Sequence, residues 1–370
     1  MAGAGDKEGM GSPARCYNAT RMTAAKPRVP GVLVVGDINV DILARIEAFP
    51  AAGEDCLVPE LELHCGGVGA NTAMALAHWG VPVRLCGTTG RDSFGELALG
   101  FLRRERIDVS LVRQSEHATT GLMFIAVSPD GQRTIFGSRG ANTELVAPMD
   151  DTHFLDGIQA AHLMGYNFLS QSGAQVAERL LSEVHRRGGW VSLDVGMAPS
   201  RQIPEVILQA AAKVDILFVS QTEATALTGQ RDNPSVFGAL ETRGVREVVM
   251  KLGEQGCLFR ENGILREAPS FAIAAADSTG AGDAFAAAFI RARLHDWPVA
   301  EAALLANASG AAAASVVGAG ERMPAPPHIL RVLRANRLAT PWDALRICVL
   351  ERLEAELGLK ESAAISGGRK

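Results

Sequence analysis

The segment DSTGAGDAF, residues 277–285, carries the clearest chemical signal in the chain. Gly280, Ala281 and Gly282 precede Asp283, which opens an Ala-rich stretch predicted to be helical. Small residues let the backbone approach a ligand closely, and free N–H groups at a helix start bind anions. Asp283 would accept a proton from a hydroxyl while these N–H groups stabilise charge on a phosphoryl group in transfer. An ordinary helix-capping Asp after a glycine-rich turn is the alternative that this pattern leaves open.

Alternating strands and helices must position this segment. Short apolar runs that end at Gly, such as 32–36 and 83–87, are typical of buried parallel strands. Two adjacent helices are expected over 280–294 and 299–316. The alternation predicts an α/β fold whose mostly parallel sheet is covered on both faces. Further strands are expected over 161–165, 190–195, 215–220 and 245–253, and further helices over 69–80, 93–107 (with Ser93 as N-cap), 173–189 and 222–229.

Other segments do not fit this core. Polar strand material near 42–64 and 118–137, with a hairpin over 121–137 that turns at Pro129-Asp130-Gly131, would suit a small β-sheet flap. A second hairpin is expected over 256–268, turning at Asn262-Gly263. Residues 341–359 predict an amphipathic helix that would dock on the core or on a partner.

The composition excludes several classes of protein. The 370 residues carry 36 Lys and Arg against 41 Asp and Glu, so the net charge of −5 leaves no basic excess for binding nucleic acid. Six cysteines without paired spacing predict reduced thiols in a cytoplasmic protein. No signal peptide is expected, and the Ala-rich stretch 302–320 is expected to be a buried helix rather than a membrane span. His64 and His162 are expected to be structural.

Several motifs, taken together, resemble those of the ribokinase (PfkB) family of carbohydrate kinases. The Gly-Ala-Gly-Asp run resembles the family's C-terminal motif, and GGVGANTAMALAHWG (66–80) resembles its Gly-Gly motif and the helix after it. Five further segments follow the family's order and spacing. They are GDINVDI (36–42, likened to the first strand and the loop after it), SRGANTEL (138–145), LDVGMAP (193–199), SQTEATALTG (220–229) and KLGEQG (251–256). The resemblance implies a doubly wound, mostly parallel sheet with helices on both faces and a small β-sheet lid. It covers residues 31–335 and leaves a disordered tail over 1–30, and a C-terminal helix with a mobile tail over 336–370.

The resemblance also implies roles for residues at the sugar and phosphate sites. Asp283 would be the general base that activates the substrate hydroxyl, beside an anion hole of Gly280, Ala281 and Gly282. Carboxylate and amide groups suit polyols because they accept and donate hydrogen bonds in fixed directions. The expected sugar-binding residues are Asn39, Asp41, Gly66, Gly67, Asn71 and Asn142.

ATP and Mg²⁺ are the cofactors that the resemblance implies. Glu223 matches the acidic end of the family's N-x-x-E motif and would hold Mg²⁺ partly through water. Asp277 and Thr279 match positions that bind a monovalent cation in many members, so K⁺ is a further candidate. The nucleotide-binding residues implied by the motifs are Ser220, Gly253, Gly256, Asn307 and Gly318.

Three positions depart from the family's pattern. Ser220 replaces the Asn of N-x-x-E, which would alter the water network around Mg²⁺. Val68 stands where ribokinases often have Lys, which weakens the case for a phosphorylated substrate. Arg139 would meet an anionic group of the substrate if it pointed inward, but a solvated Arg beside the hairpin is the favoured interpretation.

These residues predict an ATP-dependent kinase that phosphorylates a hydroxymethyl group of a sugar. A nucleoside kinase of the same family is the nearer alternative, disfavoured by the few aromatic residues in the lid segments, which are Phe49, Phe124 and Phe136. A non-catalytic sugar sensor on the same fold is the alternative from another class. The expected partners are a small sugar and ATP, with no nucleic acid and no membrane, and pairing of two lids would give a homodimer.

Overall fold

A nine-stranded sheet forms the centre of the molecule in the computed structural model, which describes residues 30–129, 132–147 and 153–359. Neighbouring strands are parallel from β11 through β5, and β12 and β13 complete one edge as an antiparallel hairpin. The strand order is β13-β12-β11-β10-β9-β8-β1-β4-β5. The bounds are β1 Gly31–Val35, β4 Val83–Gly90, β5 Asp108–Ser115, β8 Ile158–Met164, β9 Trp190–Asp194, β10 Ile216–Ser220, β11 Glu247–Lys251, β12 Cys257–Glu261 and β13 Ile264–Ala268.

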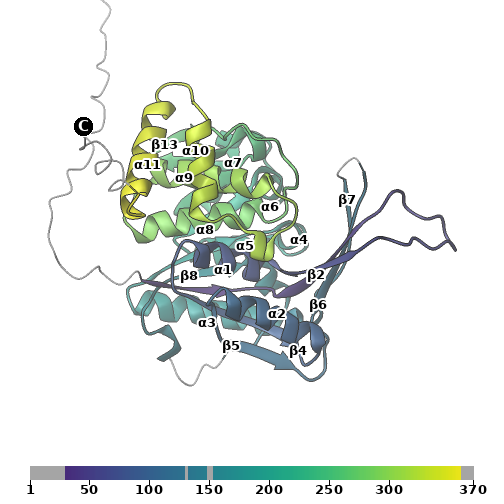
Figure 1. Cartoon of the computed structure of the whole chain (residues 1–370). Helices are drawn as coiled ribbons and strands as arrows, with labels where there is room; N and C mark the ends of the chain where they lie inside the picture. The colour runs from purple at the N-terminus through teal and green to yellow at the C-terminus, as the bar shows by residue number, and fades with distance from the viewer. Residues whose placement is uncertain (1–29, 130–131, 148–152, 360–370) are drawn as a thin grey trace, which may run out of the picture.

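Helices cover both faces of this sheet (Figure 1). Along β1, Val32 and Val34 enter one hydrophobic core and Leu33 and Val35 enter the other, because successive strand side chains point to opposite faces. The first core takes side chains of α1 Val68–His78, α2 Ser93–Arg104, α8 Ala281–Leu294, α9 Val299–Ala314, α10 Pro326–Ala335 and α11 Trp342–Glu356. The second core takes side chains of α3 Gln171–Arg186, α5 Pro204–Ala211, α6 Gln221–Thr228 and α7 Asn233–Thr242, and α4 Met197–Gln202 contacts α6. The predicted doubly wound architecture is confirmed.

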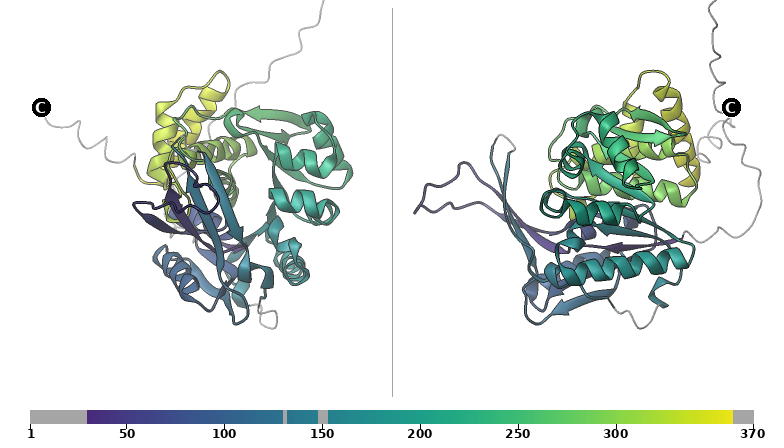
Figure 2. Two further views of the ribbon diagram at one scale, coloured as in Figure 1. Left: turned by 90° about the vertical axis from the view of Figure 1, so that its right-hand side faces the viewer. Right: turned by 180° about the vertical axis from the view of Figure 1, so that it is seen from behind.

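A separate four-stranded sheet, called here the small sheet, extends away from the helices (Figures 1 and 2). Its order is β3-β2-β6-β7, with bounds β2 Asn39–Arg45, β3 Leu61–Gly66, β6 Gly121–Val127 and β7 Arg133–Ser138. β6 and β7 form the predicted antiparallel hairpin, although the tip of its turn lies outside the described residues. One expectation was wrong: Asn39 and Asp41 lie on β2, not in a loop after β1.

The structure confirms two predicted turns and corrects one predicted helix start. Gly229 ends α6 in the left-handed conformation, and Asn262 and Gly263 turn the β12–β13 hairpin with positive φ, both as predicted. The N-cap of α2 is Asp92, not Ser93, because the Asp92 carboxylate accepts a hydrogen bond from the N–H of Gly95. The same carboxylate accepts bonds from Thr120, which ties α2 to the entry of β6.

The C-terminal helix α11 docks on the core rather than standing free (Figure 1). Val349 and Leu353 are completely buried, and Glu356 pairs with Arg291 of α8 and accepts a bond from the Trp297 indole. Across the described ranges, no helix has the length and apolar character needed to cross a membrane. The chain before residue 30 and after residue 359, for which tails were predicted, lies outside the described residues.

Candidate active site

The first turn of α8 presents backbone N–H groups beside Asp283. Gly280 is the N-cap with a φ of 73°, a backbone conformation that favours glycine, and a Cβ there would displace the flexible end of Met323, whose Cε would lie 2.1 Å away. The N–H of Ala281 donates to the carbonyl of Ser278 at 3.2 Å, which engages one of the three predicted anion-hole groups. The N–H of Gly282 lies in the first turn, where a helix offers no internal acceptor.

Asp283 is held by Asn71 of α1. Nδ2 of Asn71 donates to Oδ2 of Asp283 at 2.9 Å, and Oδ1 of Asn71 accepts from the N–H of Gly320 at 3.0 Å. Burial raises the pKa of Asp283 to about 7, against the opposing effect of the Asn71 bond. A carboxyl group with this pKa exchanges protons near neutral pH, as a general base must.

Asp41 offers an open acceptor at the other end of the site. It lies on β2 opposite His64 of β3, and its buried Oδ1 has no hydrogen-bond partner among the described residues. Burial raises the pKa of Asp41 to about 6. Gly66 gives this carboxylate its space, because a Cβ there would lie 2.2 Å from Oδ2. Buried polar atoms are normally bonded, so an unpaired Oδ1 indicates a place for a ligand donor.

Asn142 supports this end of the site instead of facing a ligand. Its Oδ1 accepts from the N–H of Ile38 at 2.8 Å, and its Nδ2 donates to Oδ1 of Asn39 and to the carbonyl of Arg139, both at 2.8 Å. These bonds use both N–H donors of Asn142, and its bond to Asn39 fixes the position of that side chain. Gly67, also predicted for the sugar site, turns the chain with a φ of 91° against the carbonyl of Asp37.

Lys251 and Asp194, which were not among the residues predicted from the sequence, form a largely buried ion pair with side chains 17% and 12% exposed. Nζ of Lys251 contacts the two carboxylate oxygens of Asp194 at 2.9 and 2.6 Å. Burial alone would lower the pKa of Lys251, but the charges of Asp194, Glu223 and Asp283 raise it overall. Both partners end parallel strands, where α/β proteins place their sites, and this position of Lys251 in KLGEQG was the available signal.

A cleft of about 740 Å³ lies beside Lys251 and the start of α8. Its walls combine apolar side chains such as Phe271 and Ile273 with polar backbone turns. Five predicted residues line it together: Gly253, Gly256, Ala281, Gly282 and Asn307. Asn307 is buried at one wall and donates to the carbonyls of Ala268 and Pro269.

Ser220 lies outside this cleft and acts as the N-cap of α6. Its hydroxyl accepts from the N–H of Glu223 at 3.3 Å, and Oε2 of Glu223 accepts from the N–H of Ser220 at 2.7 Å. This capping box engages Oε2 of Glu223 and fixes the orientation of its carboxylate. In the described ranges no group of three or more His, Cys, Asp or Glu side chains is placed to hold a metal ion.

Gly318 and Thr279 surround Asp277 instead of approaching the cleft. Oδ2 of Asp277 accepts from the N–H of Gly318 at 2.9 Å, and Oδ1 accepts from the N–H and hydroxyl of Thr279 at 2.8 and 2.7 Å. Gly318 is not among the residues that line the cleft of about 740 Å³, and its predicted contact with the nucleotide stays a prediction.

Arg139, His64 and His162 make contacts that their sequence positions did not define. Arg139 is not the free, solvated side chain that was expected, because its guanidinium donates two bonds to the Asp37 carboxylate, at 2.9 and 2.8 Å. His162 is completely buried with Nδ1 2.8 Å from Oγ of Ser192, and burial lowers its pKa to about 3, which agrees with the expected structural role. His64 lies nearer the chemistry than expected: Nδ1 is 2.6 Å from Oε1 of Glu321, and that bond raises the pKa of the imidazole.

The fold and this arrangement of an acid, helix N–H groups and a cleft agree with the predicted family. The sequence matches the family described as pfkB family carbohydrate kinase over residues 30–326. The chain belongs to this family, and the predicted class, a phosphotransferase with an alcohol group as acceptor, is confirmed.

Individual relatives share most of their length with this chain. A ribokinase of Haemophilus influenzae is 27% identical over 305 residues, which cover 81% of this chain and 97% of that protein. An ATP-dependent ribose-1-phosphate kinase of Halopiger xanaduensis is 31% identical over 290 residues, which cover 78% and 93%. The structure of Arabidopsis thaliana ribokinase complexed with ribose and ATP superposes with a TM-score of 0.72 at 28% identity, covering 82% of this chain and 98% of that one.

Proposed function

We propose that this protein transfers the γ-phosphoryl group of ATP to the hydroxymethyl group of a neutral sugar. The observation that carries the proposal is the position of Asp283 at the start of α8, where burial raises its pKa to about 7 and Asn71 donates a hydrogen bond to it. The Asp283 carboxylate thus lies near Asp41, whose Oδ1 is an open acceptor, and beside the cleft that Gly282 lines.

The sugar would bind between the small sheet and α1. Asp41 accepts a hydrogen bond from a sugar hydroxyl at its unpaired Oδ1, and Asn39 and Asn71 bind neighbouring hydroxyls. Asp283 takes the proton of the attacking hydroxyl as the bond to phosphorus forms. Desolvation prepares Asp283 for this role, because it stabilises the protonated form that the step produces.

ATP would occupy the cleft with its adenosine between Gly256, Phe271 and Asn307 and its phosphates toward α8. The N–H groups of Gly280 and Gly282 and the ammonium of Lys251 then stabilise negative charge on the transferred group. The Arabidopsis relative was solved with ribose and ATP, which supports both ligands for this chain.

Glu223 and Asp194 are the acids that would face Mg²⁺ through its waters. Asp194 contacts Lys251, which lines the cleft, and the charges of Asp194 and Glu223 both raise the pKa of Lys251. Bound Mg²⁺ would neutralise charge on the ATP phosphates. The capping bond to the N–H of Ser220 fixes the orientation of the Glu223 carboxylate.

A neutral sugar fits the charges better than an anionic one. The Arg139 guanidinium is neutralised by Asp37, and Val68 replaces a Lys that many ribokinases carry. The proposed sugar site is lined by Asp41, Asn39 and Asn71. The Asp41 carboxylate would repel a phosphate group on the sugar, and the two neutral amides would not neutralise its charge.

We further propose that the small sheet is a lid that closes over the sugar within a kinase domain of residues 31–335, and that two lids pair in a homodimer. Asp41 faces the site from β2, whereas Ile42 belongs to an opposite-facing row with Leu63, Phe124 and Phe136 in register. The side chains of Leu63, Phe124 and Phe136 are 42%, 38% and 61% exposed, which leaves an apolar row for a second copy to cover.

A coupled assay of ADP release tests the proposed function. Purified protein with Mg²⁺ and ATP is given pentoses, hexoses, sugar acids, phosphosugars and nucleosides in parallel. Turnover with one neutral sugar far above the other compounds is expected. Preferential turnover of a nucleoside would replace the proposal with the nucleoside kinase alternative, and preferential turnover of an anionic sugar would overturn the substrate class.

A further inference from the structure

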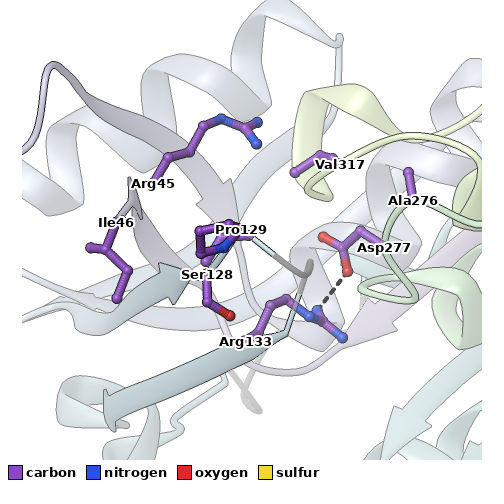
Figure 3. Close-up of a pocket in the computed structure, with 9 residues that line it drawn as sticks. Arg45, Ile46, Ser128, Pro129, Arg133, Ala276, Asp277 and Val317 are labelled. Atoms are coloured by element: carbon purple, nitrogen blue, oxygen red, sulfur yellow. Dashed lines mark ion pairs between the residues drawn. The ribbon is translucent and has the colours of Figure 1, made fainter. Parts of the chain in front are cut away.

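Arg133 of the small sheet makes an ion pair with Asp277 of the core (Figure 3). Nη1 of Arg133 lies 2.7 Å from Oδ1 of Asp277, and Nη2 donates to the hydroxyl of Ser278 at 3.1 Å. The two side chains are 24% and 4% exposed, so the pair is largely removed from solvent. The contact spans a cavity of about 230 Å³ that Arg45 and Pro129 also line.

Asp277 is the residue at which the family resemblance implies a monovalent cation. In this chain its carboxylate already receives the N–H and hydroxyl of Thr279, the N–H of Gly318 and the guanidinium of Arg133. Three of these donors converge on Oδ1 and one binds Oδ2, so Oδ1 has no acceptor position left for a further ligand. A guanidinium also supplies the positive charge that a cation would bring, so the residues present do not fit a bound K⁺.

The ion pair links the two ligand-binding halves of the site. Arg133 pairs with Val127 across β6 and β7, and Val127 pairs with Arg45 at the end of the strand that carries Asp41. On the core side, Asp277 and Ser278 lead directly into the Gly280 turn, and the carbonyl of Ser278 accepts from the N–H of Ala281. The contact between Arg133 and Asp277 therefore connects the small sheet, which carries the proposed sugar-binding residues, to the turn that leads into the N–H groups of α8.

We propose that Arg133 is a positioning residue that replaces a monovalent cation at Asp277, so that phosphoryl transfer by this protein does not depend on K⁺. This inference rests on the proposed function for its kinetic readout. The guanidinium holds the 277–279 segment in place, and this segment in turn holds the N–H groups that stabilise the transferred phosphoryl group.

The test compares wild type with Arg133→Ala, Arg133→Lys and Arg133→Gln in potassium chloride and in tetramethylammonium chloride of equal ionic strength. Wild-type kcat should differ less than about twofold between the two salts. In tetramethylammonium chloride, Arg133→Ala should lose about tenfold or more in kcat, because displaced catalytic groups slow the reaction. Millimolar guanidinium chloride or K⁺ should restore much of that loss, a rescue that a merely structural defect would not show.

Arg45→Ala is the matched control. Arg45 lines the same cavity from the small sheet, but it lies 3.6 Å from Glu62 and its side chain is 56% exposed. This variant should behave like wild type in both salts. Arg133→Lys should retain more activity than Arg133→Gln, because the ammonium keeps the charge at Asp277. Equal losses in these two variants would contradict the proposed charge replacement.

A second readout does not need the sugar. Calorimetry gives the dissociation constant of ADP with Mg²⁺ in each salt, and K⁺ should tighten binding in Arg133→Ala and Arg133→Gln but not in wild type. A wild-type protein activated tenfold or more by K⁺, or an Arg133→Ala protein with unchanged kcat and salt response, would overturn the inference. If no compound were phosphorylated, the proposed function would fail, while the ADP measurement would still decide the role of Arg133.

Discussion

The amide of Asn71 donates a hydrogen bond to the carboxylate of Asp283 at 2.9 Å, across 212 positions of sequence. The bond joins the first turns of α1 and α8, and Gly320 holds the same amide from the opposite end. It engages Oδ2 and leaves Oδ1 of Asp283 as the atom to receive a proton. Its donor N–H also stabilises the charged carboxylate, so the bond keeps the base from becoming too strongly protonated.

Asp283→Asn should lower kcat by at least about a hundredfold, the usual range for loss of a general base. The amide is nearly the same size, and its oxygen still accepts from Asn71, so ADP and sugar affinities should stay within about threefold of wild type. Calorimetry measures binding and the coupled assay measures kcat. Near-normal turnover in this variant would remove Asp283 from its proposed role.

The pH dependence should report the raised pKa of Asp283. Because the base must be deprotonated, kcat/KM should fall as pH is lowered through about 7. Asn71→Ala removes a bond that lowers this pKa, so the acidic limb should move to higher pH. Asn233→Ala, at an exposed bond to Gln221, is the control and should leave the profile in place. An acidic limb that stays fixed or moves to lower pH in Asn71→Ala would contradict the assignment.

Lys251→Met should weaken both the fold and catalysis. Removing the ammonium leaves the Asp194 charge buried without its partner, which should reduce the free energy of unfolding by about 3–5 kcal/mol. The ATP phosphates also lose a positively charged partner. The kcat should therefore fall and the KM for ATP should rise, and together these changes should lower kcat/KM by about a hundredfold.

Lys213→Met is the control for this substitution. Its partner is Glu178, both side chains are about half exposed, and such pairs contribute at most about 1 kcal/mol. Urea unfolding measures the stabilities. The double variant Asp194→Asn with Lys251→Met should recover part of the stability but none of the catalysis. Full activity in Lys251→Met would show that the ammonium has no part in phosphate binding.

Gly66→Ala should impair sugar binding selectively. Its Cβ would lie 2.2 Å from the Asp41 carboxylate, which must then move away from its present position. The KM for the sugar should rise by about tenfold or more, with the KM for ATP nearly unchanged. Gly100→Ala in α2, where a Cβ meets nothing within 4 Å, should keep wild-type kinetics and gain about 0.5–1 kcal/mol of stability. Equal effects of Gly66→Ala on both substrates would contradict a role confined to the sugar end.

Phe136→Glu should separate the proposed lid-to-lid dimer into monomers. The substitution places a charge in the apolar row that Phe124 and Leu63 continue, and an unpaired charge is costly to bury. Light scattering at micromolar concentration measures the mass. Ile347→Glu, at a 44% exposed position on α11, should remain dimeric. A monomeric wild type, or a Phe136→Glu protein that stays dimeric, would exclude this surface as the interface.

Much of the fold was predictable because local signals and the long-range pattern agree. Apolar strand runs alternate with helical spacing, and Gly229 and Asn262-Gly263 carry turn chemistry that acts within a few residues. The Gly-Ala-Gly-Asp run predicted the start of α8 for the same reason, since Gly280 needs its left-handed conformation locally. Helix α11 was predicted as amphipathic, but only packing showed that Val349 and Leu353 enter the core.

The sequence by itself determined the family, the α/β architecture and the candidate base, because motifs record what a chain needs within one turn or one strand. The tertiary structure decided which side chains form hydrogen bonds and ion pairs with each other. The pairs are Asn71 with Asp283, Lys251 with Asp194, Arg139 with Asp37 and Arg133 with Asp277. Each pair joins segments tens to hundreds of positions apart. Charge and hydrogen-bond energies depend on distance and burial, so these pairings, and the open oxygen of Asp41, exist only once the sheets and helices are assembled.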